Sequence, residues 1–345
     1  MSNRVRHRQQ LAWCFAAATV PAVMTCAGRP WRWVLAGCGA VAVFFWLIGA
    51  VMRQTGCERG LSGAVLRAFG PYFGGGLLVL SGIWALFAAA DTAAACAGTF
   101  PDGGIERLAA PVLLALGGMS GKKGAHCAAR CAAVAAPVLA GLYALILVCA
   151  LPNVEVRWCA PWGSWEDGAA VLAPMLLPMA ALYLQRERAC DARMRGAALA
   201  ALALGPAAMA VVTAGCLSPQ VTQEETFAFY TLTKNMRLLS VMERFEPVLS
   251  ASLVLGYFCL LTLLLESASG QIGAGIGKPR NGRRTAALCA VVYAGTFWVG
   301  RVPQIVRQIG AAVFWGVVPA LALLIVAIKK VRKKAKKEVD KPRTL

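Results

Sequence analysis

The residues of this chain that could do chemistry are few, and the most informative are prolines inside long apolar segments. Pro21 lies in LAWCFAAATVPAVMTCA, and Pro174 and Pro178 lie in AAVLAPMLLPMAALYL. Because proline removes a backbone donor and clashes with the preceding turn, we expect each segment to break into half-helices. Backbone groups without a hydrogen-bond partner are tolerated in a membrane only where protein or a polar cavity satisfies them. Two such breaks in corresponding helices therefore predict a small-molecule site. Alternatively, the prolines only kink their helices.

Asp91, in WALFAAADTAAAC, is the one acidic residue expected well inside an apolar segment. Holding a charge in hydrocarbon costs several kcal/mol, so such a residue usually faces a cavity, an ion or a partner. It could instead reach the membrane interface. Trp84 lies about two turns earlier on the same side of the helix. In a later segment, Tyr257 could line a cavity or bond neighbouring helices, and Glu266 is expected at the cytoplasmic boundary, paired with a loop arginine.

Enzyme and metal signatures are weak. The loop SGQIGAGIGKPRNG lacks the glycine and the Ser or Thr of a phosphate-binding loop, and we interpret it as a flexible connection. His126, Cys127 and Cys131 form a one-turn cluster without a second ligand pair, and most of the 13 cysteines lie in apolar segments as small hydrophobes. The sequence therefore predicts no enzyme, no metal and no cofactor.

The elements that would position these residues are membrane helices. Hydrophobic residues make up 59% of the chain, charged residues only 15%, and the mean hydropathy is +0.62. A membrane span needs about 20 apolar residues. We therefore expect an all-α polytopic protein with about ten spans, near 11–27, 31–52, 72–97, 108–120, 127–151, 168–185, 196–216, 247–267, 285–301 and 310–328.

Charge on the loops predicts the orientation. Most of the 35 Lys and Arg residues fall in alternate loops and in the two ends of the chain, which places both termini in the cytoplasm. This topology accounts for much of the +19 net charge without a nucleic-acid partner. We expect one membrane domain with a retained amino-terminal anchor: a tail (1–10), five helices (11–151), five more (168–328) and a basic tail (329–345). The basic tail is a topogenic signal or binds anionic lipid.

Two stretches carry motifs in a recognisable order. In KKGAHCAARCAAVAAPVLAGLYALILVCALPNVEVRWCAPW these are Lys123-Gly124, Arg130, Pro137, Asn153 and Pro161. In FAFYTLTKNMRLLSVMERFEPVLSASLVLGYF the Glu243-Arg244 pair leads into an apolar span. Both stretches resemble the spore germination permease family, the B subunits of germinant receptors. The chain departs from that family at Ala125-His126 and in its richness in alanine.

The resemblance implies a fold like that of amino acid/polyamine/organocation transporters, with two inverted five-helix repeats, broken helices 1 and 6, and a pocket between spans one, three, six and eight. It implies a small germinant such as an amino acid, receptor A and C subunits as partners, and the inner membrane of the spore. The implied pocket residues are Thr19, Val20, Pro21 and Ala22 at the first break, Ala173, Pro174, Met175 and Pro178 at the second, and Trp84, Asp91 and Tyr257 beside them. Half-helix amides would hold a carboxylate and Asp91 an ammonium.

Three functions remain open on the sequence. The resemblance favours a sensor subunit whose ligand changes its affinity for partner subunits. A secondary transporter of amino acids or other small solutes in a bacterial cytoplasmic membrane is the alternative, with Asp91 as the candidate for ion coupling. The alanine-rich, sparsely polar spans also fit a scaffold that has lost ligand binding.

Overall fold

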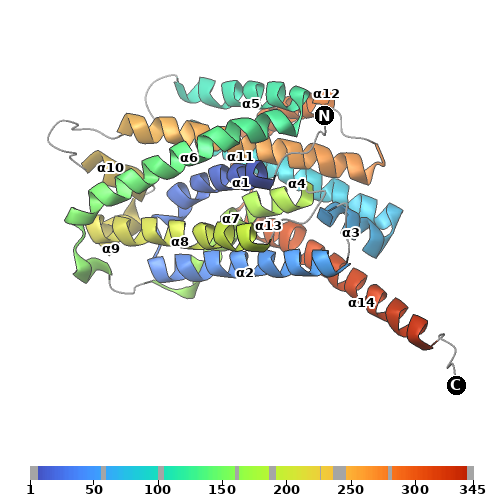
Figure 1. Ribbon diagram of the computed structural model, residues 1–345. Coiled ribbons are helices and arrows are strands. Elements are labelled where there is room, and N and C mark those ends of the chain that lie inside the picture. The colour runs from blue at the N-terminus through green and yellow to red at the C-terminus, as the bar shows by residue number, and fades with distance from the viewer. Residues whose placement is uncertain are drawn as a thin grey trace.

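The structure is a computed structural model that describes residues 7–55, 60–99, 105–159, 163–185, 192–225, 227–235, 246–278 and 282–339. In these ranges every regular element is a helix, and the helices pack side by side in one bundle (Figure 1). The short helices in the connections after α6 and after α8 lie together at one end of the bundle. At the other end α3 lies beside the point where α14 leaves it.

The helical elements follow the apolar segments of the sequence closely. In chain order they are α1 (His7–Pro21), η1 (Ala22–Cys26), α2 (Trp31–Thr55), α3 (Gly60–Phe69), α4 (Pro71–Gly98), α5 (Ile105–Lys123), α6 (Ala125–Ala150), η2 (Leu151–Asn153), η3 (Val156–Cys159), α7 (Trp165–Gln185), α8 (Ala192–Leu217), α9 (Pro219–Glu224), α10 (Ala228–Asn235), α11 (Glu246–Gly275), α12 (Gly282–Val299), α13 (Gln304–Ala311), η4 (Ala312–Val317) and α14 (Val318–Val339).

Within the described ranges, six helical stretches are long and apolar enough to cross a membrane, which indicates an integral membrane protein. They are Trp31–Gln54, Pro71–Gly98, Ala125–Asn153, Leu199–Leu217, Pro247–Gly275 and Ile305–Arg332. The other four expected segments lie on α1 with η1, α5, α7 and α12. Over the described residues these four do not combine that length with that hydropathy, so the count of ten spans stays a prediction.

Helix α11 forms the centre of the bundle. It packs against α1, α4, α5, α6 and α7, and its run Leu263, Leu264 and Leu265 is fully buried. A helix that is apolar on all sides is stable only when neighbours surround it. The peripheral helices instead expose apolar side chains such as Val43 and Trp46 of α2, which are 58% and 50% exposed and suit a lipid environment.

The expected breaks at the prolines are wrong. Pro21 ends α1 with helical backbone angles (φ −63°, ψ −29°), and the chain continues without interruption into η1, a π-helical segment. Within η1 the Ala27 amide donates to the Ala22 carbonyl over 3.0 Å, an i→i−5 bond. Pro174 and Pro178 lie inside one continuous helix, α7. Proline's fixed φ is compatible with a helix, and tight packing by neighbouring helices offsets the missing hydrogen bonds.

A second π-helical segment, η4, lies between α13 and α14. The Val318 amide donates to the Val313 carbonyl there, again skipping the usual partner. In the part of the chain that the structure describes, the two π-helical segments thus lie in the first and last apolar segments rather than in the first and sixth. Such segments occur frequently at functional sites because they locally widen the helix.

The first part of the glycine-rich run after position 267 is helical rather than a flexible connection. Helix α11 continues to Gly275, where its backbone meets that of α4 at Gly75. A Cβ on Gly75 would lie 2.7 Å from the Gly275 carbonyl oxygen. Small residues therefore allow these two helices to approach backbone to backbone, as is common in membrane proteins.

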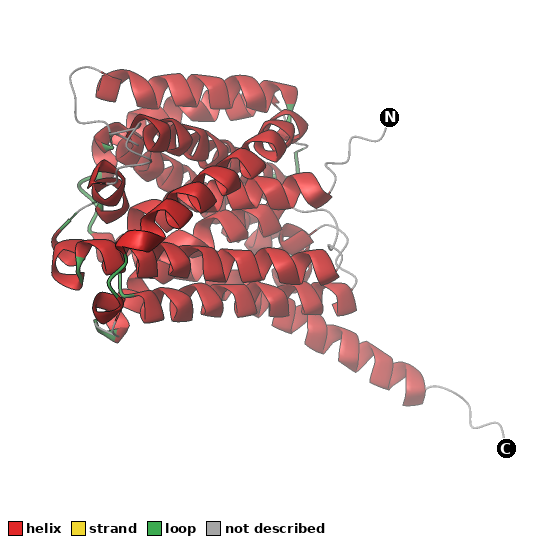
Figure 2. Cartoon of the chain, turned by 60° about the vertical axis from the view of Figure 1, so that its left-hand side comes forward, coloured by secondary structure: helices red, strands yellow, loops and turns green. Residues whose placement is uncertain are grey.

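The basic carboxyl-terminal segment begins as a helix. Helix α14 extends beyond the bundle to Val339 (Figures 1 and 2). Near its exit, the Lys329 ammonium donates to the Ala68 carbonyl over 3.1 Å, and Lys330 contacts the Gln54 carbonyl. These contacts tie the start of the tail to the ends of α2 and α3. Between α8 and α11 the chain forms α9 and α10, and residues 236–245, including Glu243 and Arg244, lie outside the described ranges.

Candidate functional site

A cavity of about 340 Å³ lies between α1 with η1, α4, α7, α11 and α13 with η4. Its wall is mostly apolar, and a few polar side chains interrupt it. A cavity of this size and composition is typical of a small-molecule site. It lies in the half of the bundle that contains the short helices α9 and α10, since Phe227, next to α10, also lines it.

Seven of the eleven residues expected in a pocket line this one cavity. They are Val20, Pro21, Trp84, Asp91, Ala173, Pro174 and Tyr257. They come from four helices, α1, α4, α7 and α11, which the sequence placed in spans one, three, six and eight. A binding role for each of them stays a prediction.

The other four expected residues are buried beside the cavity without lining it. Thr19 donates its hydroxyl to the Ala16 carbonyl over 2.7 Å. Ala22 and Met175 are 4% and 2% exposed, and Pro178 is also buried. On α7 the cavity face consists of Ala170, Ala173, Pro174 and Leu177, the spacing of one side of a helix. Met175 lies about 100° away from Pro174 around that helix.

Asp91 is paired with an arginine that the sequence analysis missed. The Arg307 guanidinium, on α13, donates from Nη1 to Asp91 Oδ1 over 2.5 Å. Both side chains line the cavity and are partly exposed, 42% for Asp91 and 32% for Arg307. The pairing reduces the cost of holding either charge in apolar surroundings. The Arg307 Nε atom is buried and has no hydrogen-bond partner among the described residues, so the guanidinium keeps a donor available.

The signal for Arg307 lay in the periodicity of its segment. Arg307, Gln308, Ala311 and Trp315 all line the cavity, and their spacing puts them along one side of a helix that continues into the last span. Positions 302–309 lie between two of the spans expected from hydropathy, so hydropathy alone assigns this arginine to a loop. The Trp315 indole N–H is buried and, within the part of the chain that the structure describes, also lacks an acceptor.

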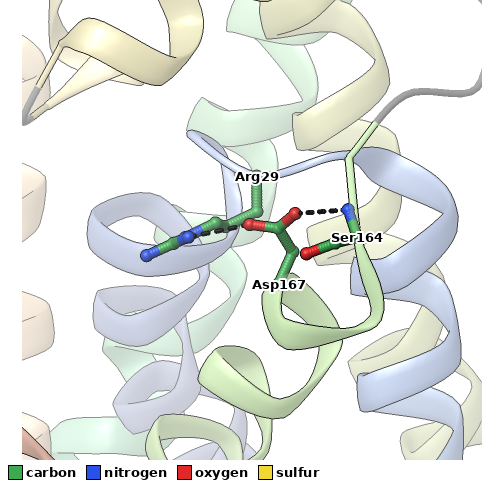
Figure 3. Close-up of polar contacts among 3 residues, drawn as sticks. All are labelled: Arg29, Ser164 and Asp167. Atoms are coloured by element: carbon green, nitrogen blue, oxygen red, sulfur yellow. Dashed lines mark hydrogen bonds and ion pairs between the residues drawn. The ribbon is translucent and has the colours of Figure 1, made fainter.

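A second ion pair connects the cavity wall, at the turn between η1 and α2, to the start of α7. Arg29 lines the cavity and donates from Nη1 to Asp167 Oδ1 over 2.8 Å. Asp167 is in the first turn of α7, and its other oxygen accepts the Ser164 amide over 3.0 Å (Figure 3). A carboxylate at this position also interacts favourably with the positive end of the helix dipole. Arg29 is therefore held over the amino-terminal end of α7.

Further bonds join the same two segments. The Trp31 indole donates to the Cys159 carbonyl over 2.9 Å, and Arg32 donates to the Gly163 carbonyl over 3.0 Å. Together with the Arg29–Asp167 pair, they fix the start of α2 against the chain that enters α7. These contacts therefore hold the segment that contains Arg29 against the start of α7.

Aromatic side chains form the remaining wall. Trp84 stacks on Phe87 with ring centroids 5.1 Å apart and contacts Phe314 at 5.8 Å. Tyr257 also lines the cavity. Its hydroxyl lies 3.2 Å from Thr99 Oγ1 and so joins α11 to the end of α4. This wall would pack against apolar parts of a ligand.

The backbone contributes a polar group as well. Pro174 has no N–H, so the Ala170 carbonyl, four residues earlier, loses its usual intrahelical donor. Ala170 and Pro174 both line the cavity. The site can therefore offer a carboxylate, two guanidinium groups, an indole N–H and a backbone carbonyl, a set suited to binding a small molecule with both charges.

Asp91 is not the only acidic residue within a helix of the bundle. Glu266 is 2% exposed and lies within α11. Its side chain lies near Gly121 of α5 and near the buried Thr285 of α12. Helix α11 continues to Gly275, and the expected position at the cytoplasmic boundary, paired with a loop arginine, stays a prediction. Glu266 does not line the cavity.

No family model matches the chain, and no curated protein matches it. The resemblance to spore germination permeases therefore stays a prediction. Among the described residues, no group of three or more His, Cys, Asp or Glu side chains gathers in a way that could hold a metal ion.

Proposed function

We propose that the protein binds a small zwitterionic solute of the amino-acid class in this cavity. The observation that supports this most is the Asp91–Arg307 pair on the wall of a largely apolar cavity, with the Arg29 guanidinium on the same wall. A carboxylate and two guanidinium groups complement an ammonium and a carboxylate respectively. The volume of about 340 Å³ is in the range of small-molecule sites.

In the proposed complex the ligand interacts with both members of the Asp91–Arg307 pair. Its ammonium binds Asp91, and its carboxylate binds Arg307 through the free Nε donor, with Arg29 nearby. Its apolar part packs against Trp84 and Tyr257. Because the ligand supplies an opposite charge to Asp91 and another to Arg307, no unpaired charge is left in the apolar wall.

We further propose that the chain acts as the membrane B subunit of a spore germinant receptor, with A and C subunits as partners and both termini in the cytoplasm. The sequence resemblance supports this, as does the agreement between the cavity-lining helices and the expected pocket helices. Ligand binding that separates Asp91 from Arg307 would favour a different arrangement of α4 and α13. That population shift would be the signal passed to the partners. The ten-span, inverted-repeat architecture belongs to the same proposal.

A secondary transporter is the alternative, and one observation favours it. Both π-helical segments contribute to the cavity wall, η1 through Met24 and Thr25 and η4 through Trp315. Local rearrangement of such segments would let α1 and α13 move and open the cavity to alternate sides. Uptake of the bound solute by sealed proteoliposomes separates this alternative from a sensor, which binds without uptake.

The binding claim is tested with the purified full chain in lipid nanodiscs and a panel of radiolabelled amino acids. We expect at least one to bind saturably to the unmodified protein. Ala173→Trp, which fills the cavity, should abolish that binding. Ala169→Trp, on an exposed side of the same helix, should not. If no member of the panel binds, or if both variants bind equally, the proposal is wrong, and a scaffold without a ligand becomes the better account.

A further inference from the structure

A second hollow lies on the periphery of the bundle, between α5, α6 and α11. Its volume is about 570 Å³, and it is lined mainly by apolar side chains, among them Leu113, Leu116, Met119, Val254, Leu255 and Phe258. We call it the α5 groove. Leu116 and Met119 are 46% and 63% exposed, so the groove opens outward. In an integral membrane protein an outward apolar groove faces lipid acyl chains.

Polar groups occur at one end of the α5 groove only. Lys123, the last residue of α5, is exposed and lines the groove. One turn earlier Ser120, which is 8% exposed, also lines it. In the described residues the Ser120 hydroxyl has no hydrogen-bond partner. A buried hydroxyl that faces a groove without a partner indicates that an acceptor from outside the chain completes it.

The order of these groups along α5 matches the order of groups in a phospholipid. From Lys123 to Leu113 the helix rises about 15 Å. This is half of the roughly 30 Å hydrocarbon thickness, so the groove spans the depth of one leaflet. A charged group comes first, a hydroxyl donor one turn deeper, and apolar side chains after it. A phospholipid presents an anionic phosphate, then ester carbonyls, then acyl chain.

We propose that the α5 groove binds one phospholipid with an anionic headgroup. Lys123 contacts the headgroup, the Ser120 hydroxyl donates to an ester carbonyl, and an acyl chain lies along Leu116 and Leu113. Charge complementarity selects the anionic class, because no acidic partner of Lys123 is present among the residues that the structure describes. The expected position of Lys123 is consistent with an anionic lipid. The loop charges assign Lys123 to the cytoplasmic side, where anionic lipids attract basic residues. This inference does not depend on the proposed function of the cavity.

The test measures lipid retention by native mass spectrometry of the full chain, after exchange with phosphatidylglycerol or phosphatidylcholine of identical acyl chains. The unmodified protein should retain phosphatidylglycerol preferentially. Lys123→Gln should lower that preference about fivefold. Lys278→Gln removes an exposed lysine next to the end of α11, away from the groove, and should leave the preference unchanged.

A second variant tests the groove itself. Leu116→Trp should reduce retention of both lipids, because the indole occupies the space of the acyl chain. Leu47→Trp, at a lipid-facing position of α2 that is 50% exposed, is the matched control and should have no effect. Equal retention of the two lipids by the unmodified protein, or equal effects of Lys123→Gln and Lys278→Gln, would overturn the proposal. Loss of a dimer in Leu116→Trp would show instead that a second protein chain covers the groove.

Discussion

At the scale of single residues, the cavity is organised by two acid–base pairs that join distant parts of the chain. Asp91 and Arg307 lie 216 positions apart, and Arg29 and Asp167 lie 138 apart. Asp91 was recognisable from the sequence because an acidic residue in an apolar segment is rare. Its partner was not, since hydropathy does not report which loop arginine reaches which helix.

The Arg29–Asp167 pair should contribute modestly to stability. Asp167→Asn removes the charge but keeps an oxygen for the Ser164 amide, so it isolates the ion pair. Because Arg29 is 40% exposed, solvent screens the interaction, and we expect a loss in free energy of unfolding of no more than about 1 kcal/mol. Thermal unfolding in detergent at low and high salt measures it.

The exposed neighbour Glu166 provides the control for that measurement. Glu166→Gln changes the same charge in the same helical turn without removing the Asp167 contact. The Asp167→Asn loss should exceed the control at low salt and shrink as salt is added. A loss that is equal in both variants would mean that the pair contributes nothing.

At the scale of helices, the sequence predicted which segments are helical but not their local geometry. Runs of apolar residues are long enough to identify the long helices, whereas Ala173 and Pro174 were expected in a pocket only through the family resemblance. The prolines were over-interpreted, because packing around α7 keeps it continuous through Pro174 and Pro178. The π-helical segment η4 has no proline at all, so composition gave no sign of it.

The contact between α4 and α11 depends on glycine. In Gly75→Ala the new methyl group would meet the Gly275 carbonyl, whereas Gly76→Ala, one position along, meets nothing within 4 Å. Overpacking of this kind typically costs about 1–3 kcal/mol. We expect Gly75→Ala to lower the thermal unfolding temperature in nanodiscs and Gly76→Ala to leave it nearly unchanged. Equal stability of the two variants would contradict the close backbone approach.

At the scale of the whole molecule, the sequence correctly indicated an all-helical membrane protein, and the structure adds the cavity between α1, α4, α7, α11 and α13 and the α5 groove. The number of spans and the inverted repeat remain predictions, since only six stretches have both the length and the hydropathy of a span over the described residues. Seven of the expected pocket residues line the cavity, and their binding role stays a prediction, whereas Arg307 on α13 and Arg29 in the turn after η1 were not among the expected residues.

The predicted orientation has a direct test. Alkaline phosphatase is active only outside the cytoplasm, so a fusion after Glu225 should be active and a fusion after Lys278 inactive. A fluorescent protein at the carboxyl terminus should fluoresce, because it would fold in the cytoplasm. Phosphatase activity after Lys278 would reverse the orientation, and with it the assignment of the α5 groove to the cytoplasmic leaflet.

The central claim is that the charge of Asp91 binds the ammonium group of an amino-acid ligand, and its most direct test is binding to Asp91→Asn. With the amino acid that binds the unmodified protein most tightly, we expect Asp91→Asn to weaken binding about tenfold or more, because a charged hydrogen bond is lost. Glu166→Gln should bind normally. Unchanged affinity in a folded Asp91→Asn protein would contradict the account.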